Sequence, residues 1–377
     1  MSSLGRASLR VDATTATAPI AVAAAHDAKR NQRSLITMYS IRLVRVVTAP
    51  MIVLLLGSSL AVGGYASGAT PSLPVRPIAD VPLGGNPTRL DYQSLDASRH
   101  LLFIAHLGDS AVIVVDTQAR RVVTRIPGVS HVHGVLAIPE RGVVYASATG
   151  TNEVVAIDET TFKITARMPG GVYPDGLAYA PDVHKVYISD EHGGTDTVID
   201  AQTNTRLTAI EIGGDIGNTQ YDATSHHIFV NAQSTKELVE IDPATDTVIR
   251  RIPVPGAEEN HGLLIDSESH RAFVACEGND RLVVLALPSG KLLESFSVAK
   301  DPDVLALDPG RHVLYVAGES GQVSMFQIGP GSVTKLAEGR FAPAAHAVAV
   351  DLASHEVYFP LENVNGRTVL RIVKQLP

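Results

Sequence analysis

Tryptophan is absent from this chain of 377 residues, and cysteine occurs once, at Cys276. The lack of tryptophan excludes WD-repeat and tryptophan-docking quinoprotein patterns. A single cysteine excludes an intramolecular disulfide, and without a C-x-x-C-H sequence no c-type haem is attached. No G-x-S-x-G nucleophile motif occurs either. We expect Cys276 to be a buried small side chain, and we expect neither haem nor nucleotide as a cofactor.

Basic side chains are also scarce. The whole chain has a net charge of −8, and residues 70–377 carry 24 basic and 37 acidic side chains, a net charge of −13. Proteins that bind nucleic acid carry a basic footprint that neutralises phosphates. The charge therefore predicts no nucleic-acid partner.

The N-terminal region does not have a globular pattern. Residues 1–37 are rich in Ala, Ser and Thr and have no clear period, so we expect an extension that is unstructured or untranslated. In residues 38–69, Arg42 and Arg45 precede an apolar centre near 51–62, which small residues follow. A basic start, a short apolar centre and small residues together are typical of a secretory signal peptide.

Cleavage of this segment is expected near Ala66 or Ala69. The mature protein is then periplasmic or extracellular. An uncleaved N-terminal membrane anchor is the alternative, although the apolar centre is short for a span of about 20 residues. Membrane association is expected only in that case.

A repeat occupies the rest of the chain. An aromatic residue recurs in short β-like runs such as LLFIAH, VVYASAT and KVYISDE, at spacings of 42, 42, 42, 44, 42 and 43 residues. The seven aromatic anchors are Phe103, Tyr145, Tyr187, Phe229, Phe273, Tyr315 and Tyr358. Such self-similarity indicates a repeat architecture.

Each repeat unit contains four candidate strands. In the third unit these are DGLAYA, KVYISD, TDTVID and TRLTAIEI, separated by turns rich in Gly, Pro, Asp and Asn. Four short strands per unit of about 42 residues predict a β-propeller blade. We therefore expect an all-β domain over residues 70–377, a seven-bladed β-propeller of four-stranded antiparallel blades. The last unit has three strands, so segment 77–85 should complete the last blade and close the ring.

The repeat resembles a known propeller family. Its Tyr-Val-x-Asn-like strand, its VVAID, TVID and VEID runs and its Pro-x-Gly before the inner strand are similar to the YVTN (YncE-like) family over residues 77–377. Asn231 is close to the family's asparagine, whereas Ala148 and Asp190 depart from it. The resemblance implies a seven-bladed propeller, commonly exported or surface-located in bacteria, with ligand sites at a mouth of the central channel.

Two residue types recur at the turn between the first and second strands. A histidine lies three residues before the aromatic in six units: His100, His184, His226, His270, His312 and His355. An aspartate lies seven residues before it in five units: Asp96, Asp222, Asp266, Asp308 and Asp351. Aspartate can cap a turn by accepting hydrogen bonds from its own backbone. We interpret both sets as scaffold residues.

The position twelve residues before the aromatic carries different chemistry. It reads Asp91, His133, Asp175, Gly217, His261, Asp303 and His346. Asn218 is the polar residue beside the single glycine. Because this position begins the innermost strand, its side chains should gather at one mouth of the channel.

Three inward histidines, each followed one blade later by an aspartate, suggest a metal site. The metal candidates are His133, His261 and His346, with Asp91, Asp175 and Asp303 as carboxylates that orient them. Imidazole favours Zn, Cu, Fe or Ni. A polar small-molecule pocket without metal is the first alternative, lined by Asp91, Asp175, Asn218, Asp303 and His131. A solvated mouth, with the function elsewhere on the protein, is the second.

Polar residues also recur four positions after the aromatic, where the second strand should return to the same mouth: Glu191, Gln233, Glu277, Glu319 and Glu362. The candidates for catalytic residues are Asp91, Asp175, Asp303, Glu191 and Glu277. We therefore expect a monomeric exported protein that binds a transition metal or a small polar ligand. A metal-dependent hydrolase, lactonase or lyase and a protein-interaction scaffold are the alternatives.

Overall fold

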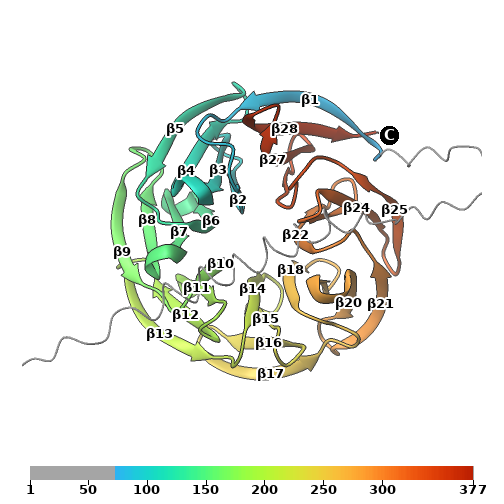
Figure 1. The fold of residues 1–377 in the computed structure, drawn as a ribbon. Helices are drawn as coiled ribbons and strands as arrows, with labels where there is room; N and C mark the ends of the chain where they lie inside the picture. Colours follow the sequence, from blue (N-terminus) through green and yellow to red (C-terminus); the bar gives the residue numbers. More distant parts are fainter. Residues whose placement is uncertain (1–72, 377) are drawn as a thin grey trace, which may run out of the picture. The chain divides into compact units, whose positions relative to one another are not determined.

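The computed structural model describes residues 73–376, which form a ring of seven four-stranded antiparallel sheets (Figure 1). The prediction of a seven-bladed propeller is thus confirmed. The N-terminal extension and the signal peptide fall outside the described residues and stay predictions. In residues 73–376 no helix is long and apolar enough to cross a membrane.

Blades 1 to 4 follow one another along the chain, each with its strands in sequence order from the axis outward. Blade 1 contains β2 (Gln93–Asp96), β3 (Leu101–His106), β4 (Ala111–Asp116) and β5 (Arg121–Pro127). Blade 2 contains β6 (Val132–Ile138), β7 (Val143–Ala148), β8 (Glu153–Asp158) and β9 (Ile164–Pro169). Blade 3 contains β10 (Pro174–Ala180), β11 (Lys185–Asp190), β12 (Thr195–Asp200) and β13 (Thr205–Glu211). Blade 4 contains β14 (Ile216–Asp222), β15 (His227–Ala232), β16 (Glu237–Asp242) and β17 (Thr247–Pro253).

Blades 5 and 6 repeat this plan, and short 3-10 turns connect some strands. Blade 5 contains β18 (Asn260–Asp266), β19 (Arg271–Cys276), β20 (Arg281–Ala286) and β21 (Lys291–Ser297). Blade 6 contains β22 (Pro302–Asp308), β23 (Val313–Gly318), β24 (Gln322–Ile328) and β25 (Val333–Arg340). The 3-10 turns are η1 (Leu107–Asp109), η2 (Pro139–Arg141), η3 (Thr149–Thr151) and η4 (Glu277–Asn279).

The ends of the described chain meet in blade 7. Its strands are β26 (Ala349–Asp351), β27 (Glu356–Val364), β28 (Arg367–Gln375) and β1 (Val75–Pro82). Strand β1 pairs antiparallel with β28, so the first strand in sequence becomes the outer strand of the last blade (Figure 1). The closure predicted for segment 77–85 is therefore confirmed, with the strand displaced slightly toward the N-terminus. This pairing leaves no gap in the ring between the first and last blades.

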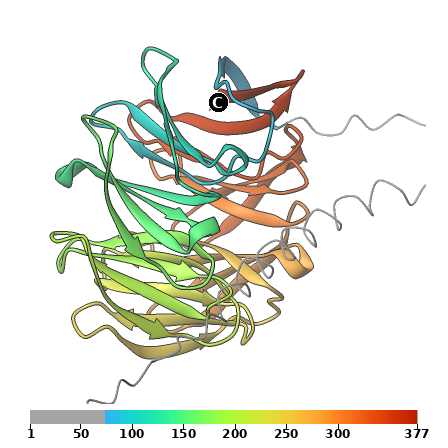
Figure 2. The ribbon, with the colours of Figure 1, turned by 60° about the vertical axis from the view of Figure 1, so that its left-hand side comes forward.

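The core lies between neighbouring blades. The second and third strands bury almost every side chain on both faces, as the near-continuous apolar runs of β3 and β4 require. Tyr145 of blade 2, for example, is fully buried and packs with Leu177 and Val186 of blade 3. The fourth strands are half exposed, and Figure 2 shows the sheets following one another around the ring. Blade-on-blade packing therefore fixes the inner strands that carry the predicted site.

The recurring turn histidines have a common backbone conformation. All six lie in the left-handed region, with φ between 54° and 62°. The aspartates cap the same turns, and Asp96 accepts hydrogen bonds from the backbone N–H groups of Ser98 and Arg99 at 2.8 and 3.2 Å. These contacts agree with a scaffold role. Cys276 is fully buried, and burial raises the pKa of its thiol to about 12.

Candidate functional site

The predicted ring residues surround the propeller axis at the start of the inner strands and are nearly all buried. We call this set the axial ring: Asp91, His133, Asp175, Asn218, His261, Asp303 and His346. Each has an exposed fraction of 5% or less. Ionisable groups are rarely buried to this degree unless they are paired or bind a ligand.

Hydrogen bonds from the second strands hold the ring in place. Ser147 donates to the carbonyl oxygen of Asp175 in the next blade at 2.8 Å, and Asn231 donates to the carbonyl oxygen of His261 at 2.9 Å. Both lie two residues after their aromatic. The register equivalents of Asn231 are thus Ser147 and Ser189, rather than Ala148 and Asp190 as the sequence comparison assumed. These side chains link the backbone of consecutive ring positions.

Close backbone approach explains the glycine that follows two of the ring histidines. A Cβ added to Gly134 would lie 2.1 Å from the carbonyl oxygen of Asp175, and one added to Gly262 would lie 1.9 Å from that of Asp303. Real Cβ atoms cannot approach so closely. Glycine therefore lets each inner strand pack directly on the next ring residue.

The loops before His133 and His346 each contain a residue with a left-handed backbone that orients the imidazole. His131 and Ala344, two residues before ring histidines, have φ values of 44° and 53°. Their carbonyl oxygens accept hydrogen bonds from Nδ1 of His133 and His346 at 2.9 and 3.2 Å. The side chain of His131 itself is exposed. In the neutral form of both imidazoles Nδ1 therefore carries the proton and Nε2 carries the lone pair.

The three ring histidines consequently differ at Nε2. In His133 it accepts a hydrogen bond from the hydroxyl of Tyr173 at 3.1 Å. In His261 it lies 3.6 Å from Asp175 and 3.8 Å from Asp303. In His346 it is buried, makes no hydrogen bond, and lies 3.9 Å from Asp91. His346 therefore presents an open nitrogen ligand toward a carboxylate.

Tyr92 is a member of the site that the sequence argument missed. Its hydroxyl donates to Oδ1 of Asn218 at 2.9 Å and lies 3.3 Å from Nε2 of His261 and 3.4 Å from Oδ1 of Asp303. It thus reaches from blade 1 across to blades 4, 5 and 6. Burial, followed by Asp303, Asp175 and Asp91, raises the pKa of the phenol well above its usual value. Tyr92 is therefore a neutral hydrogen-bonding residue.

Carboxylates dominate the charge around the ring. The ring and the ends of the second strands contribute Asp91, Asp175, Asp303, Glu191, Glu277, Glu319 and Glu362. Arg89 lies among them, with Nε 3.0 Å from Asp91 and Nη1 2.7 Å from Glu319. Burial opposes the ionisation of Asp91, but the charge of Arg89, and that of His133 and His346 in their protonated form, hold its pKa below the usual value. Burial raises the pKa of Glu362, against the opposing effect of His346. The surplus of negative charge favours a cation.

Two groups of side chains among the described residues bring three possible metal ligands close together. Asp91, Asp303 and His346 come from the adjacent blades 1, 6 and 7, and one ligand atom of each lies within 4.8 Å of the others. His261, Glu277 and Asp303 meet the same condition. The three ring histidines do not share one group. Asp175 lies 3.6 Å from Nε2 of His261 but belongs to neither group. Glu191 also belongs to neither; it is buried, and its backbone N–H donates to the carbonyl oxygen of Tyr173.

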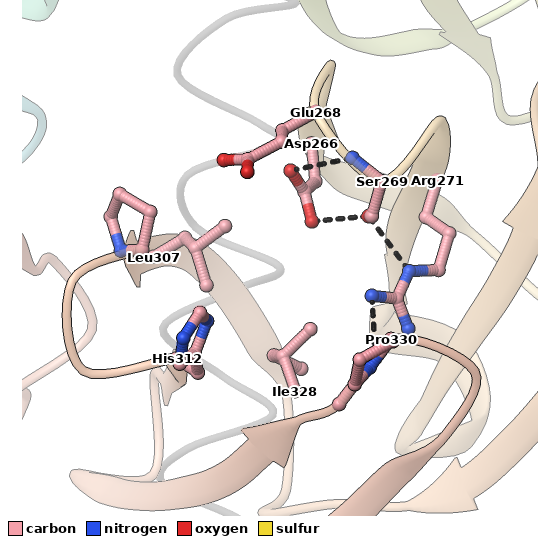
Figure 3. Close-up of a pocket in the computed structure, with 10 residues that line it drawn as sticks. Asp266, Glu268, Ser269, Arg271, Leu307, His312, Ile328 and Pro330 are labelled. Atoms are coloured by element: carbon pink, nitrogen blue, oxygen red, sulfur yellow. Dashed lines mark hydrogen bonds between the residues drawn. The ribbon is translucent and has the colours of Figure 1, made fainter.

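A surface pocket of about 340 Å³ lies between the turns of blades 5 and 6, at the opposite ends of the inner strands (Figure 3). The guanidinium group of Arg271 lines it and donates to Ser269 Oγ at 2.8 Å and to the carbonyl oxygen of Gly329 at 2.9 Å. Asp266 accepts a hydrogen bond from the same serine. The polar groups of this pocket therefore connect the turns of the two blades, and the axial ring is the stronger candidate for a functional site.

Comparisons with known proteins identify the fold. No family model matches the sequence, and no curated protein matches it. Hydrazine synthase of Kuenenia stuttgartiensis is similar in structure, with 14% identity and a TM-score of 0.65 over 81% of this chain and 98% of that chain. The structure of U3-55K is similar with 11% identity and a TM-score of 0.68, over 79% of this chain and 100% of that chain. A chain of the mitotic checkpoint complex is similar with 9% identity and a TM-score of 0.68, over 89% of this chain and 99% of that chain. Identities this low show the propeller fold alone.

Proposed function

We propose that this protein binds a divalent metal cation in the axial ring through Asp91, Asp303 and His346. The observation that carries the proposal is Nε2 of His346, which is buried, makes no hydrogen bond and belongs to a group with two carboxylates. A buried ring nitrogen that makes no hydrogen bond is unfavourable in an apoprotein. A metal ion would satisfy it, while the bond from Nδ1 to Ala344 supplies the outer contact typical of ligating histidines.

Two further features support a cation. The ring and the ends of the second strands are rich in carboxylates, which attract positive charge. Three protein ligands would also leave positions open for water or for a second molecule.

The repeat further supports our proposals that the chain belongs to the YVTN family and is exported, as the sequence resemblance implies.

Titration calorimetry of chelator-treated protein without a His tag tests the proposal. We expect one ion of Mn(II), Zn(II) or Ni(II) per chain. Replacing His346 with alanine removes a ligand, so its affinity loss should be at least the tenfold that changes to outer contacts typically cause.

His270→Asn is the matched control. It removes an exposed imidazole at the far end of the inner strand of blade 5, where asparagine tolerates the left-handed backbone. It should bind like the wild type. Equal affinity of His346→Ala and wild type, or no binding by wild type, would contradict the proposal. Binding of an organic molecule by the metal-free protein would instead favour the small-ligand alternative.

A further inference from the structure

We infer that Gln233 withholds His261 from the metal, so that the axial site prefers oxygen-favouring ions such as Mn(II) over nitrogen-favouring ions such as Zn(II). The claim about metal preference, which we call the metal arm, rests on the proposed function. The claim about the His261 tautomer can be tested without metal. Gln233 is a positioning residue, because it acts through the imidazole of His261.

The amide of Gln233 has a fixed orientation. Its Nε2 donates to the carbonyl oxygen of Ile216 at 3.2 Å and to Nδ1 of His261 at 2.8 Å. Turning the amide over would place its oxygen against the Ile216 carbonyl oxygen, and two acceptors cannot bond to each other. Nδ1 of His261 is therefore the acceptor, and the proton of the neutral imidazole lies on Nε2.

The surroundings of Nε2 agree with a proton there. The groups near it are the hydroxyl oxygen of Tyr92 at 3.3 Å and carboxylate oxygens of Asp175 and Asp303 at 3.6 and 3.8 Å. All of these can accept. Tyr92 in turn donates its own proton to Oδ1 of Asn218 at 2.9 Å. The hydrogen bonds therefore run in one direction, from Gln233 through His261 and Tyr92 to Asn218.

The other two ring histidines have the opposite tautomer. His133 and His346 donate from Nδ1 to the carbonyl oxygens of His131 and Ala344. A backbone carbonyl only accepts, whereas the Gln233 amide nitrogen only donates. The ring thus contains two imidazoles with a lone pair at Nε2 and one with a proton there, and Tyr173 already occupies the lone pair of His133.

This pattern sets the ligand chemistry of the site. Asp91, Asp303 and His346 supply two oxygen ligands and one nitrogen ligand, while His261 keeps a proton on the nitrogen that faces Asp303. Carboxylates suit Mn(II), and additional imidazoles shift a site toward Zn(II), Ni(II) and Cu(II). Gln233 is therefore the residue that keeps the site rich in oxygen ligands.

Nitrogen NMR of metal-free protein with labelled histidine tests the tautomers directly, because protonated and bare ring nitrogens have different chemical shifts. At a pH where the imidazoles are neutral, we expect the proton of His261 on Nε2 and those of His133 and His346 on Nδ1. In Gln233→Glu the new carboxylate accepts from Nδ1, so the His261 proton should move there. A wild-type His261 with its proton on Nδ1 would overturn the inference and leave the proposed function untouched.

The metal arm compares affinities for Zn(II) and Mn(II). Gln233→Glu should raise the ratio of Zn(II) to Mn(II) affinity by about tenfold or more, the size of effect that changes to outer contacts produce. Gln233→Met, which removes the donor without adding charge, should raise the ratio in the same direction. Gln327→Glu is the matched control, since the Gln327 amide also donates to backbone carbonyl oxygens, those of Arg311 and His312, but lies at the turn of blade 6 outside the axial ring, so the ratio should stay unchanged.

The outcomes separate the two claims. Metal binding by wild type with the same ratio in all three variants would overturn the inference and leave the proposed function standing. No metal binding by any variant would overturn the proposed function and the metal arm together. A ratio that rises in Gln233→Glu but not in Gln233→Met would show that charge, rather than the tautomer, decides the selectivity.

Discussion

Glu159 is a buried carboxylate whose replacement by glutamine should stabilise the propeller at alkaline pH. Its exposed fraction is 1%, and neither of its carboxylate oxygens makes a hydrogen bond. Its backbone N–H donates to the carbonyl oxygen of Gly142. The equivalent backbone hydrogen bond in four other blades is donated by Thr117, Ala201, Leu287 and Ile328. Most of those blades place an apolar side chain at this position. Blade 2 therefore buries a titratable group where the repeat favours an uncharged one.

The magnitude follows from the pKa of this carboxyl. Burial, followed by the negative charge of Asp96, raises it from 4.5 to about 7. Each pKa unit corresponds to about 1.4 kcal/mol, so ionised Glu159 destabilises the folded state by about 3 kcal/mol. The pKa of Glu159 is higher in the folded state than in the unfolded state. Protonation of Glu159 therefore contributes stability that is fully present below pH 4.5 and is lost as the pH rises through about 7.

Thermal unfolding at pH 5 and pH 8 checks this prediction. For a propeller of roughly 300 residues, about 3 kcal/mol corresponds to about 5 °C in Tm. Glu159→Gln should therefore raise Tm by about 5 °C at pH 8 and by much less at pH 5. Glu211→Gln, at an exposed site on β13, should shift Tm little at either pH. An equal shift of Glu159→Gln at both pH values would refute the reasoning.

Two other substitutions test the packing that supports the ring. Gly134→Ala places a Cβ against the Asp175 carbonyl oxygen, so it should lower the unfolding free energy by about 1–3 kcal/mol and weaken cation binding. Gly142 has a φ of 60° and no atom within 4 Å of an added Cβ, so Gly142→Ala should lower the unfolding free energy by about 1–2 kcal/mol and leave cation binding intact. Weaker cation binding in Gly142→Ala than in Gly134→Ala would contradict the account. Burial, followed by the charge of Asp190, raises the pKa of Asp196 well above its usual value, so the fold favours its neutral form. Asp196→Asn should then keep the unfolding free energy within about 1 kcal/mol of wild type in urea at pH 7, and a larger loss would show that a charged Asp196 is required.

The blade plan could be predicted from the sequence because every blade repeats one packing problem. The aromatic residue, the capped turn and the apolar second and third strands recur at almost constant spacing, so register alone locates the inner strands. Ring closure followed from counting strands, since the last unit lacks one. The same register located the axial ring, because residues at one position of a repeat occupy one position around the axis.

The chemistry of the ring could not be predicted in the same way. Which nitrogen of each histidine carries a proton depends on the loop carbonyls and on Gln233, and these contacts come from backbone turns and from a neighbouring blade. Tyr92 had a signal that was missed. Tyr92 directly follows Asp91, at the register position where blades 2, 3 and 5 have Gly134, Gly176 and Gly262. Blade 4 has the polar Asn218 at this position, and Asn218 is the hydrogen-bond partner of Tyr92.

Crystals grown with Mn(II) provide the most direct test of the central claim, because anomalous scattering locates the ion without reference to its ligands. The account predicts one peak per chain at about 2.0–2.3 Å from a carboxylate oxygen of Asp91, one of Asp303 and Nε2 of His346. An ion elsewhere on the chain, or an axial ring that stays empty at saturating Mn(II), would contradict it.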